Sequence, residues 1–291
     1  MPAHWPQVEL GQVGPDYADI AAAILTAFAG DDLDPDVIAD ICDRAYNGPA
    51  FAHRAVTPLK HLEPGTWLLE LFHGPTLAFK DIALRLIAAL WDHVLAEQGA
   101  RRCAIVATSG DTGGAAVDAL AGARAVDLVA LHPAGRITEV QRRFMTTTTA
   151  SNIHNIAVDG DFDAAQAVVK ALFADQAFAD EVALSAVNSI NWVRIAAQAA
   201  YYVATCRELG QPVHFVVPTG NFGDALAGLV ARRLGAAVAG VRVAVNANDV
   251  LAQGLNGGAF CAGASKATLS PAMDIQLPSN FERLVFEAAG R

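Results

Sequence analysis

The sequence predicts an α/β fold in which helices cover both faces of parallel sheets. From Trp67 onward, short runs of apolar and β-branched residues alternate with longer runs whose apolar residues recur every three or four positions. Polar, glycine-containing loops separate these runs, and the alternation is typical of doubly wound sheets. A chain of 291 residues with 53% hydrophobic residues is long enough for two such domains.

Two helices are expected before this alternation, at Tyr17–Phe28 and Pro35–Tyr46, with Asp34 as the N-cap of the second. The predicted strands are Thr66–Leu69, which is expected to be buried, Cys103–Ala107, Val126–Leu131, Ile153–Val158, Val182–Val187, Val213–Val217 and Val238–Val245. The predicted helices between them are 80–99, Gly113–Leu120, Thr138–Met145, Phe162–Phe173, Ile190–Leu209 and Asp224–Leu234. In folds of this kind, ligands bind beyond the carboxyl ends of the strands.

Composition and charge argue against several classes of function. The formal net charge is -10 and basic residues occur in pairs at most, so nucleic acid is not an expected partner. The four cysteines are far apart and form no C-x-x-C pair, which is typical of buried cysteines in a reducing cytoplasm. No apolar run reaches the length of a membrane span, and the eight histidines lack metal-ligand spacing. We therefore expect a cytoplasmic protein without a metal and without a membrane contact.

Lys80 stands in the first turn of a predicted helix, shortly after a turn at Gly74 and Pro75. The positive end of the helix dipole opposes an ammonium group there and favours a neutral amine. A neutral amine is the form that a nucleophilic or Schiff-base lysine needs. The chain has only four lysines against sixteen arginines, which favours a role for this amine. An ordinary solvated surface lysine is the alternative.

The loop Ser109–Gly114 connects a predicted strand to a predicted helix. Its glycines allow a close backbone approach, and its hydroxyl and N–H groups can bind a carboxylate at the helix start. It lacks the G-x-G-x-x-G pattern of a dinucleotide site. The alternative is an ordinary loop in which Ser109 or Asp111 caps the helix.

A second glycine-containing loop, Pro218–Asp224, has the same position after a later strand. Gly220 and Gly223 permit positive φ, so that successive N–H groups can converge on a phosphate at the start of the next helix. Asp224 would repel that phosphate, and it is expected to turn away and cap the helix. An ordinary turn between strand and helix is again the alternative.

A third polar loop contains Asn188, Ser189 and Asn191 at the end of a strand, with Ser189 as a candidate N-cap. Arg194, one turn further on, can bind an anionic group through two N–H groups. A solvated helix residue is the alternative for Arg194. Asp161 is expected to be an N-cap, because the EF-hand spacing of a calcium site is missing.

Taken together, these segments resemble the threonine synthases. Glu70–Asp81 matches the pyridoxal-phosphate lysine segment of that family nearly residue for residue, and the order and spacing of the loops match from about Pro64 onward. The resemblance implies a fold-type-II pyridoxal-phosphate enzyme with two doubly wound domains of parallel or mixed sheets. It further implies the conversion of O-phospho-L-homoserine and water to L-threonine and phosphate.

The resemblance also implies roles for individual residues. Lys80 would carry the cofactor covalently and then move protons, and Phe79 and Asp111 would bind the cofactor. The residues that would hold the cofactor phosphate are Gly220, Asn221, Phe222, Gly223 and Asp224. The residues that would bind the substrate are Ser109, Gly110, Thr112, Asn188, Ser189, Asn191 and Arg194. The expected assembly is a monomer or a homodimer.

Compared with family members, the chain looks shortened at both ends, and its C-terminal part looks incomplete. The expected regions are 1–66 (helical), 67–100 (the strand–helix unit with the cofactor lysine), 101–180 (a smaller α/β domain) and 181–291 (the rest of a large domain). Such a chain is expected to be weakly stable, prone to aggregate or reliant on a partner. It is also expected to bind the cofactor poorly and to form little threonine. A related phospholyase or dehydratase, and an inactive protein that binds phosphorylated ligands, are the alternative functions.

Overall fold

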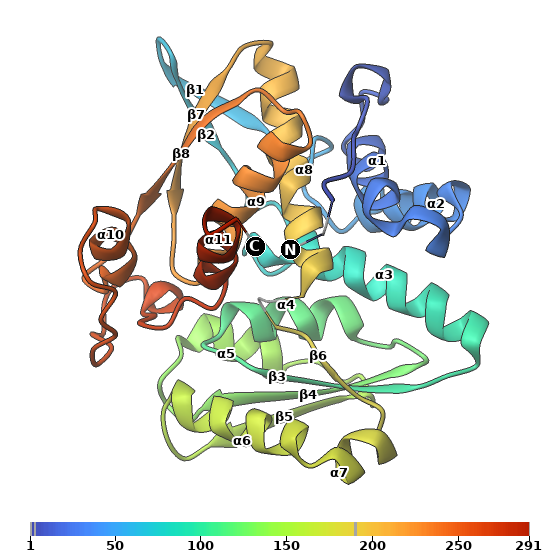
Figure 1. The fold of residues 1–291 in the computed structure, drawn as a ribbon. Coiled ribbons are helices and arrows are strands. Elements are labelled where there is room, and N and C mark those ends of the chain that lie inside the picture. The colour runs from blue at the N-terminus through green and yellow to red at the C-terminus, as the bar shows by residue number, and fades with distance from the viewer. Residues whose placement is uncertain (1, 3, 189–190, 291) are drawn as a thin grey trace. The chain divides into compact units, whose positions relative to one another are not determined.

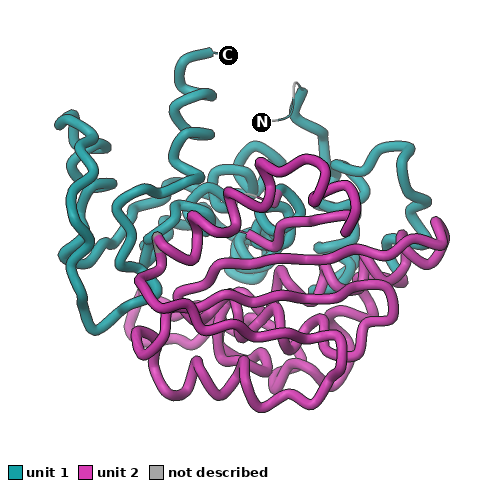
Figure 2. The backbone as a smooth tube through the Cα atoms, turned by 90° about the horizontal axis from the view of Figure 1, so that it is seen from below, with its two compact units in different colours: residues 1–39, 192–291 teal, residues 40–191 magenta. Residues whose placement is uncertain are grey.

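The computed structural model describes residues 2, 4–188 and 191–290. The chain forms two compact units, one of residues 1–39 and 192–291 and the other of residues 40–191 (Figure 2). The four regions expected from the sequence stay a prediction. No helix in the described part of the chain is both long and apolar enough to cross a membrane.

A four-stranded parallel sheet forms the centre of the unit of residues 40–191. Its strands lie in the order β5 (Ile153–Val158), β4 (Val126–Pro133), β3 (Arg102–Ala107) and β6 (Leu184–Ala186). The helices are α3 (Lys80–Gln98), α4 (Asp111–Leu120), α5 (Glu139–Thr146), α6 (Phe162–Ala174) and α7 (Gln176–Glu181). Helices α4 and α5 lie on one side of the sheet, and α6 and α7 lie on the other (Figure 1). The predicted covering of both faces is thereby confirmed for this sheet.

The core of this sheet is apolar because side chains of neighbouring strands and of α6 meet on one face. Ile105, Leu131 and Ala165 are buried in one cluster. Asp161 caps α6, since its carboxylate accepts a hydrogen bond of 2.9 Å from the Ala164 N–H group, which confirms that prediction.

A two-stranded antiparallel hairpin precedes α3, and its first strand was not predicted. β1 (Leu59–Glu63) pairs with β2 (Thr66–Leu69) around Pro64 and Gly65, and Gly65 has a φ of 79°. The expectation that the second strand is buried is wrong. Trp67 and Leu68 are 41% and 44% exposed, because the hairpin is a separate two-stranded sheet.

The second unit combines the first 39 residues with the chain from Trp192 onward. Its helices are α1 (Tyr17–Ala29), α8 (Trp192–Leu209), α9 (Gly223–Arg233), α10 (Val250–Leu255) and α11 (Phe281–Ala288). Its strands β7 (Val213–Pro218) and β8 (Val238–Ala244) pair in parallel. Helix α1 packs against α8, and the Arg207 guanidinium donates hydrogen bonds of 2.9 Å to the carbonyl groups of Val13 and Gly14.

The remaining elements are short. Helix α2 (Pro35–Tyr46) has the predicted bounds, and Asp34 accepts a hydrogen bond of 2.8 Å from the Asp36 N–H group, as an N-cap does. Single 3-10 turns lie at Leu10–Gln12, Gly30–Asp32 and Pro271–Met273. The sequence pattern did not predict α7, α10 or α11, whose lengths of six to eight residues leave little periodicity to detect.

Candidate active site

The backbone before Lys80 is fixed by the buried carboxylate of Asp81. This carboxylate accepts hydrogen bonds from the N–H group of Thr76 at 2.8 Å and from its hydroxyl at 2.6 Å. A Cβ atom on Gly74 would lie 2.4 Å from Asp81 Oδ2, so only glycine fits where the turn passes this side chain. The turn between β2 and α3 is thereby tied to the first helical turn, which contains Lys80.

The side chain of Lys80 is largely buried and ion-paired. Its Nζ atom lies 2.7 Å from Asp111 Oδ2 and 4.5 Å from the centre of the Phe79 ring. Only 14% of the Lys80 side chain is exposed. The alternative of a solvated surface lysine is therefore wrong, and Phe79 and Asp111 both lie against the Lys80 side chain.

The charge of Asp111 follows from its neighbours. Burial by itself raises the pKa of this carboxyl, but attraction to Lys80 and the hydrogen bonds from Lys80 and Gln141 outweigh that effect and hold the pKa below its ordinary value. Asp111 is therefore an anion at neutral pH. Its partner Gln141, from α5, was missed by the sequence analysis because no local pattern links it to the loop 30 residues earlier.

The loop that follows β3 is capped by a residue that was not predicted. The Thr108 hydroxyl oxygen accepts hydrogen bonds from the N–H groups of Gly110 at 3.0 Å and Gly113 at 2.8 Å. The alternative in which Ser109 or Asp111 caps α4 is thus wrong. Ser109 and Thr112 are partly exposed residues after the carboxyl end of β3, which is where ligands bind in folds of this kind.

In the other unit, the loop Gly220–Asp224 has a different geometry from the expected one. Neither glycine has a positive φ, whereas Phe222 lies in the left-handed region at a φ of 63°, so the expectation for Gly220 and Gly223 is wrong. The reason for glycine at 220 is space, because a Cβ atom there would lie 3.0 Å from the Met273 Cα atom. The loop still delivers the N–H groups of the first turn of α9, which have no partner within the helix.

The segment that precedes α11 supports this loop. The N–H and hydroxyl groups of Ser279 donate hydrogen bonds of 3.2 and 3.1 Å to Asn221 Oδ1. The Asn280 N–H group donates one of 3.2 Å to the Asn221 carbonyl group. Phe222 is buried, and its ring lies 5.5 Å from that of Phe281 in an edge-to-face arrangement. Asn221 and Phe222 therefore hold the loop in place through the chain near residue 280.

Asp224 does not cap α9, contrary to the expectation. Its Oδ1 atom accepts hydrogen bonds from the hydroxyl groups of Tyr201 and, at 2.8 Å, Tyr202, both on α8. Burial, followed by the negative charge of Asp224, raises the pKa of both phenols, which therefore stay protonated as donors. The N-cap position of α9 is occupied by Phe222, whose side chain makes no capping hydrogen bond.

Arg194 is a buried cation on the same helix. Its side chain is 3% exposed, and its Nε and Nη1 atoms have no hydrogen-bond partner among the described residues. Burial lowers its pKa to about 10, so it is still charged at neutral pH. The alternative of a solvated helix residue is therefore wrong. A buried, unpaired guanidinium is costly unless an anion joins it.

Gln198 and the third polar loop complete the residues near α8. Gln198, one turn after Arg194, is also buried, and its Oε1 atom lies 3.9 Å from a Cβ atom built on Gly223. Asn188 and Asn191 are partly buried and end the other unit, where the Asn191 N–H group donates to the Asn188 carbonyl at 3.3 Å. Ser189 lies outside the described residues.

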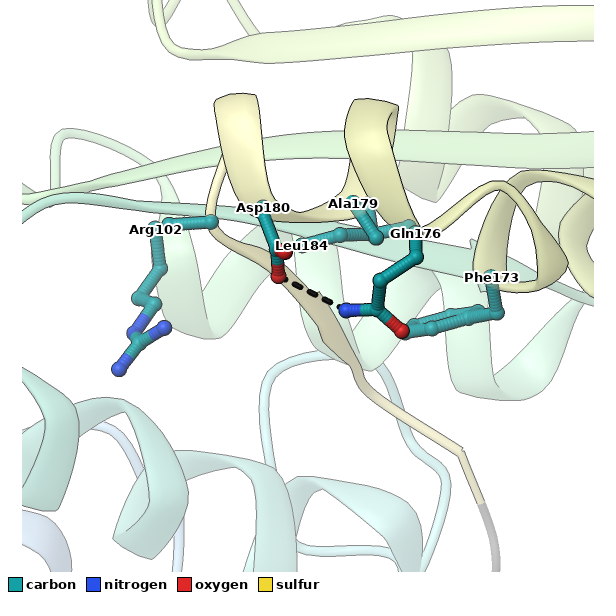
Figure 3. Close-up of a pocket in the computed structure, with 7 residues that line it drawn as sticks. Arg102, Phe173, Gln176, Ala179, Asp180 and Leu184 are labelled. Atoms are coloured by element: carbon teal, nitrogen blue, oxygen red, sulfur yellow. Dashed lines mark hydrogen bonds between the residues drawn. The ribbon is translucent and has the colours of Figure 1, made fainter.

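One cavity lies away from these residues. It has a volume of about 270 Å³ and is lined by Arg102, Phe173, Gln176, Ala179, Asp180, Ala183 and Leu184 (Figure 3). Arg102 begins β3 and Leu184 begins β6, so the cavity lies at the amino edge of the parallel sheet. Lys80 binds Asp111 at the opposite, carboxyl edge. The cavity is therefore not part of the candidate active site.

Comparisons with known proteins agree with the resemblance in the sequence. A family profile described as pyridoxal-phosphate dependent enzyme matches residues 50–291. The threonine synthase of Pseudomonas aeruginosa is 49% identical over 283 residues, which cover 96% of this chain and 60% of that protein. The threonine synthase of Corynebacterium glutamicum is 40% identical over 306 residues, covering 100% of this chain and 63% of that protein.

A solved structure gives the same result. The pyridoxal-phosphate-bound threonine synthase from Brucella melitensis matches with a TM-score of 0.93 at 45% identity, covering 100% of this chain and 64% of that one. The expected similarity to threonine synthases and the expected fold-type-II architecture are confirmed. The chain spans about 60% of the length of the Pseudomonas aeruginosa relative.

Proposed function

The chain belongs to the family of pyridoxal-phosphate dependent enzymes, and from that premise we propose that it converts O-phospho-L-homoserine and water to L-threonine and phosphate. The observation that carries the proposal is the largely buried ion pair of Lys80 and Asp111, with Nζ 2.7 Å from Oδ2, at the carboxyl edge of a parallel sheet. A primary amine at this edge of the sheet is what the proposed chemistry would need. The ion pair favours the ammonium form, so the lysine would have to lose a proton before it could bond to the cofactor, and Asp111 would hold it until then.

The residues present fit pyridoxal phosphate. Lys80 would supply the primary amine that bonds to the aldehyde of the cofactor, and the Phe79 ring lies beside that amine. Gly220, Asn221, Phe222, Gly223 and Asp224 supply the N–H groups at the start of α9, a helix of 11 residues whose dipole favours a phosphate. When bound, the cofactor supplies an electron sink for the charge left when protons leave carbon.

The chain's own residues then have separable tasks. Lys80 Nζ would take one proton from Cα and one from Cβ of the substrate and would return them to Cα and Cγ, and Asp111 would hold the lysine while it is protonated. Ser109 and Thr112 would bind the substrate carboxylate through hydroxyl and N–H groups. The N–H group of Gly110 already donates to Thr108, so Gly110 would contribute the backbone shape of this loop. Asn188, Ser189, Asn191 and Arg194 bind the phosphate of the substrate. The C–O bond to that phosphate breaks, and water adds its hydroxyl at Cβ, so that the products are threonine and phosphate.

The test combines product analysis with labelling. With cofactor and O-phospho-L-homoserine, the chain should form threonine and phosphate in equal amounts, and Lys80→Ala should form neither. An oxo-acid in place of threonine would indicate a phospholyase. Binding of the substrate without any product would indicate an inactive protein. Either result would refute the proposal.

Borohydride reduction with cofactor, followed by peptide mapping, should label Lys80. The other three lysines, Lys60, Lys170 and Lys266, are exposed and serve as internal controls for non-specific reaction. Preferential label on any of them would refute the role of Lys80.

A further inference from the structure

The side-chain amide of Gln141 has only one orientation that satisfies its neighbours. Thr138 is the N-cap of α5, and its N–H and hydroxyl groups both donate to Gln141 Oε1 at 3.0 Å. The Gln141 N–H group in turn donates to the Thr138 hydroxyl oxygen at 3.2 Å. Because the amide oxygen is engaged by two donors, the amide nitrogen is the atom that faces Asp111.

The two oxygen atoms of the Asp111 carboxylate have different hydrogen-bond partners. Gln141 Nε2 donates to Oδ1 at 2.7 Å, and Lys80 Nζ donates to Oδ2 at 2.7 Å. Rotation of the carboxylate would lose at least one of these short, charge-assisted bonds. Gln141 therefore sets which oxygen atom of Asp111 faces the lysine.

The backbone of the loop leaves room for this contact. A Cβ atom on Gly110 would lie 2.4 Å from Gln141 Cδ, and the φ of Gly110 is 126°. Both the space and the backbone angle require glycine at this position. The loop is thus shaped to admit a side chain from α5, and this contact is part of the site's construction.

We propose that Gln141 is a positioning residue that orients the Asp111 carboxylate as the ion partner of Lys80. In this role Gln141 acts through Asp111, to which its amide nitrogen donates. The inference rests on the proposed function for the task of Lys80, whereas the orientation of Asp111 is a property of the chain itself. It can therefore be tested without turnover.

Two substitutions separate positioning from helix capping. Gln141→Glu keeps an acceptor for Thr138, since glutamate is a usual partner in a capping box, but replaces the donor to Asp111 by a negative charge. Gln141→Leu removes both functions at similar size. Gln176→Leu is the matched control, because it removes a hydrogen bond of 2.8 Å from a glutamine to Asp180 elsewhere in the same unit.

The measurement is the titration of the Asp111 carboxyl group, monitored by carbon-13 NMR of the full chain without added cofactor. Circular dichroism checks that each variant is folded. The pKa of Asp111 should rise by about one unit in Gln141→Leu and by more in Gln141→Glu, and it should not change in Gln176→Leu. If Gln141→Leu fails to fold, Gln141→Glu still decides the result.

An unchanged Asp111 titration in a folded Gln141→Glu variant would overturn the proposal. So would an equal shift in Gln176→Leu. Failure of the proposed function would give a different result. The unmodified chain would then form no threonine, while the titrations of Asp111 in the variants would still shift as expected.

Discussion

The carboxylate of Asp81 holds both the N–H and the hydroxyl group of Thr76, at 2.8 and 2.6 Å, and this pair joins the turn before α3 to the helix turn that carries Lys80. Burial raises the pKa of Asp81, although the two hydrogen bonds from Thr76 act in the opposite direction. The pair therefore stabilises the turn at the cost of a desolvated charge.

Two substitutions of Asp81 should have different effects. Asp81→Ala leaves a buried N–H group of Thr76 without an acceptor and should lower the free energy of unfolding by about 1–3 kcal/mol. Asp81→Asn can accept from the N–H group and donate to the hydroxyl oxygen, so it should cost less than half as much. Denaturant unfolding measures both, and equal losses would contradict the importance of the hydrogen bonds.

The ion pair of Lys80 and Asp111 should make stability depend on pH in the acid range. Because the folded state lowers the pKa of Asp111, the stabilisation is complete above the unfolded pKa, about 3.9, and is lost as the pH falls through the lower, folded value. Asp111→Asn should remove this part of the acid-induced loss.

The control for that measurement is Asp127→Asn, which removes an exposed ion pair with Arg101 in the same unit. Exposed ion pairs contribute little to stability, about 0–1 kcal/mol. The stability of Asp127→Asn should therefore depend on pH as that of the wild type does between about pH 2 and pH 5, a range that includes the pKa of an aspartate in the unfolded chain. If the stability of the wild type falls no more steeply at acid pH than that of Asp111→Asn, the ion pair of Lys80 and Asp111 does not contribute to stability.

Arg194→Met should have opposite effects on stability and on anion binding. Loss of a buried, unpaired charge should raise the free energy of unfolding of the ligand-free chain by about 1–3 kcal/mol. Affinity for inorganic phosphate should fall at least about tenfold, because charged hydrogen bonds are lost. Arg207→Met, on the same helix, should lower stability and leave phosphate binding unchanged. Calorimetric titration with inorganic phosphate measures the affinity of each variant. Unchanged phosphate affinity in Arg194→Met would exclude an anion site at Arg194.

The two glycines of the 220–224 loop should tolerate alanine unequally. Gly220→Ala brings a Cβ atom to 3.0 Å from the backbone of Met273, which must move, and should cost about 1–3 kcal/mol. In Gly223→Ala, the one tight contact of the new Cβ atom is with the end of the Asn280 side chain, at 3.3 Å, and the contacts with Ile195 and Gln198, at 3.7 and 3.9 Å, are ordinary ones, so the change should cost less than about 1 kcal/mol. A larger loss for Gly223→Ala, measured by thermal or denaturant unfolding, would contradict this geometry.

The exposed face of β7 should promote self-association. Val216 is 68% exposed on this strand, which pairs with β8 alone among the described residues. Exposed apolar strands are sites of association. Light scattering should show a mass that rises with concentration, and Val216→Lys should reduce the rise. A constant monomer mass in both proteins would refute the expectation.

Local signals in the sequence were enough to predict most of the fold. The bounds of α2, β2 and β5 agree with the structure, because capping residues and apolar periodicity are local properties. Lys80 could be chosen because its segment, its rarity and its place at a helix start all point to the same residue. Phe79 and Asp111 contact Lys80, and their expected part in cofactor binding stays a prediction.

The rest depends on packing between distant segments. Gln141 reaches Asp111 across 30 positions, and no periodicity indicates such a contact. The φ angles of Gly220 and Gly223 could not be inferred, because Phe222 takes the left-handed conformation instead. The burial of Arg194 depends on the packing around α8, which contacts both α1 and α9, whereas the sequence shows only an arginine one turn into a helix.

The hydrogen bonds from Arg207 to Val13 and Gly14 have a consequence for the order of events during synthesis. Residues 40–191 are contiguous and can fold as soon as they leave the ribosome, whereas residues 1–39 must wait for α8. At a common translation rate, that wait lasts on the order of 8–30 s. During this time, the apolar face of α1, with Ile20 and Ile24, stays open to chaperones. A nascent chain stalled before residue 192 should therefore bind a chaperone through α1, and one stalled well after residue 209 should not.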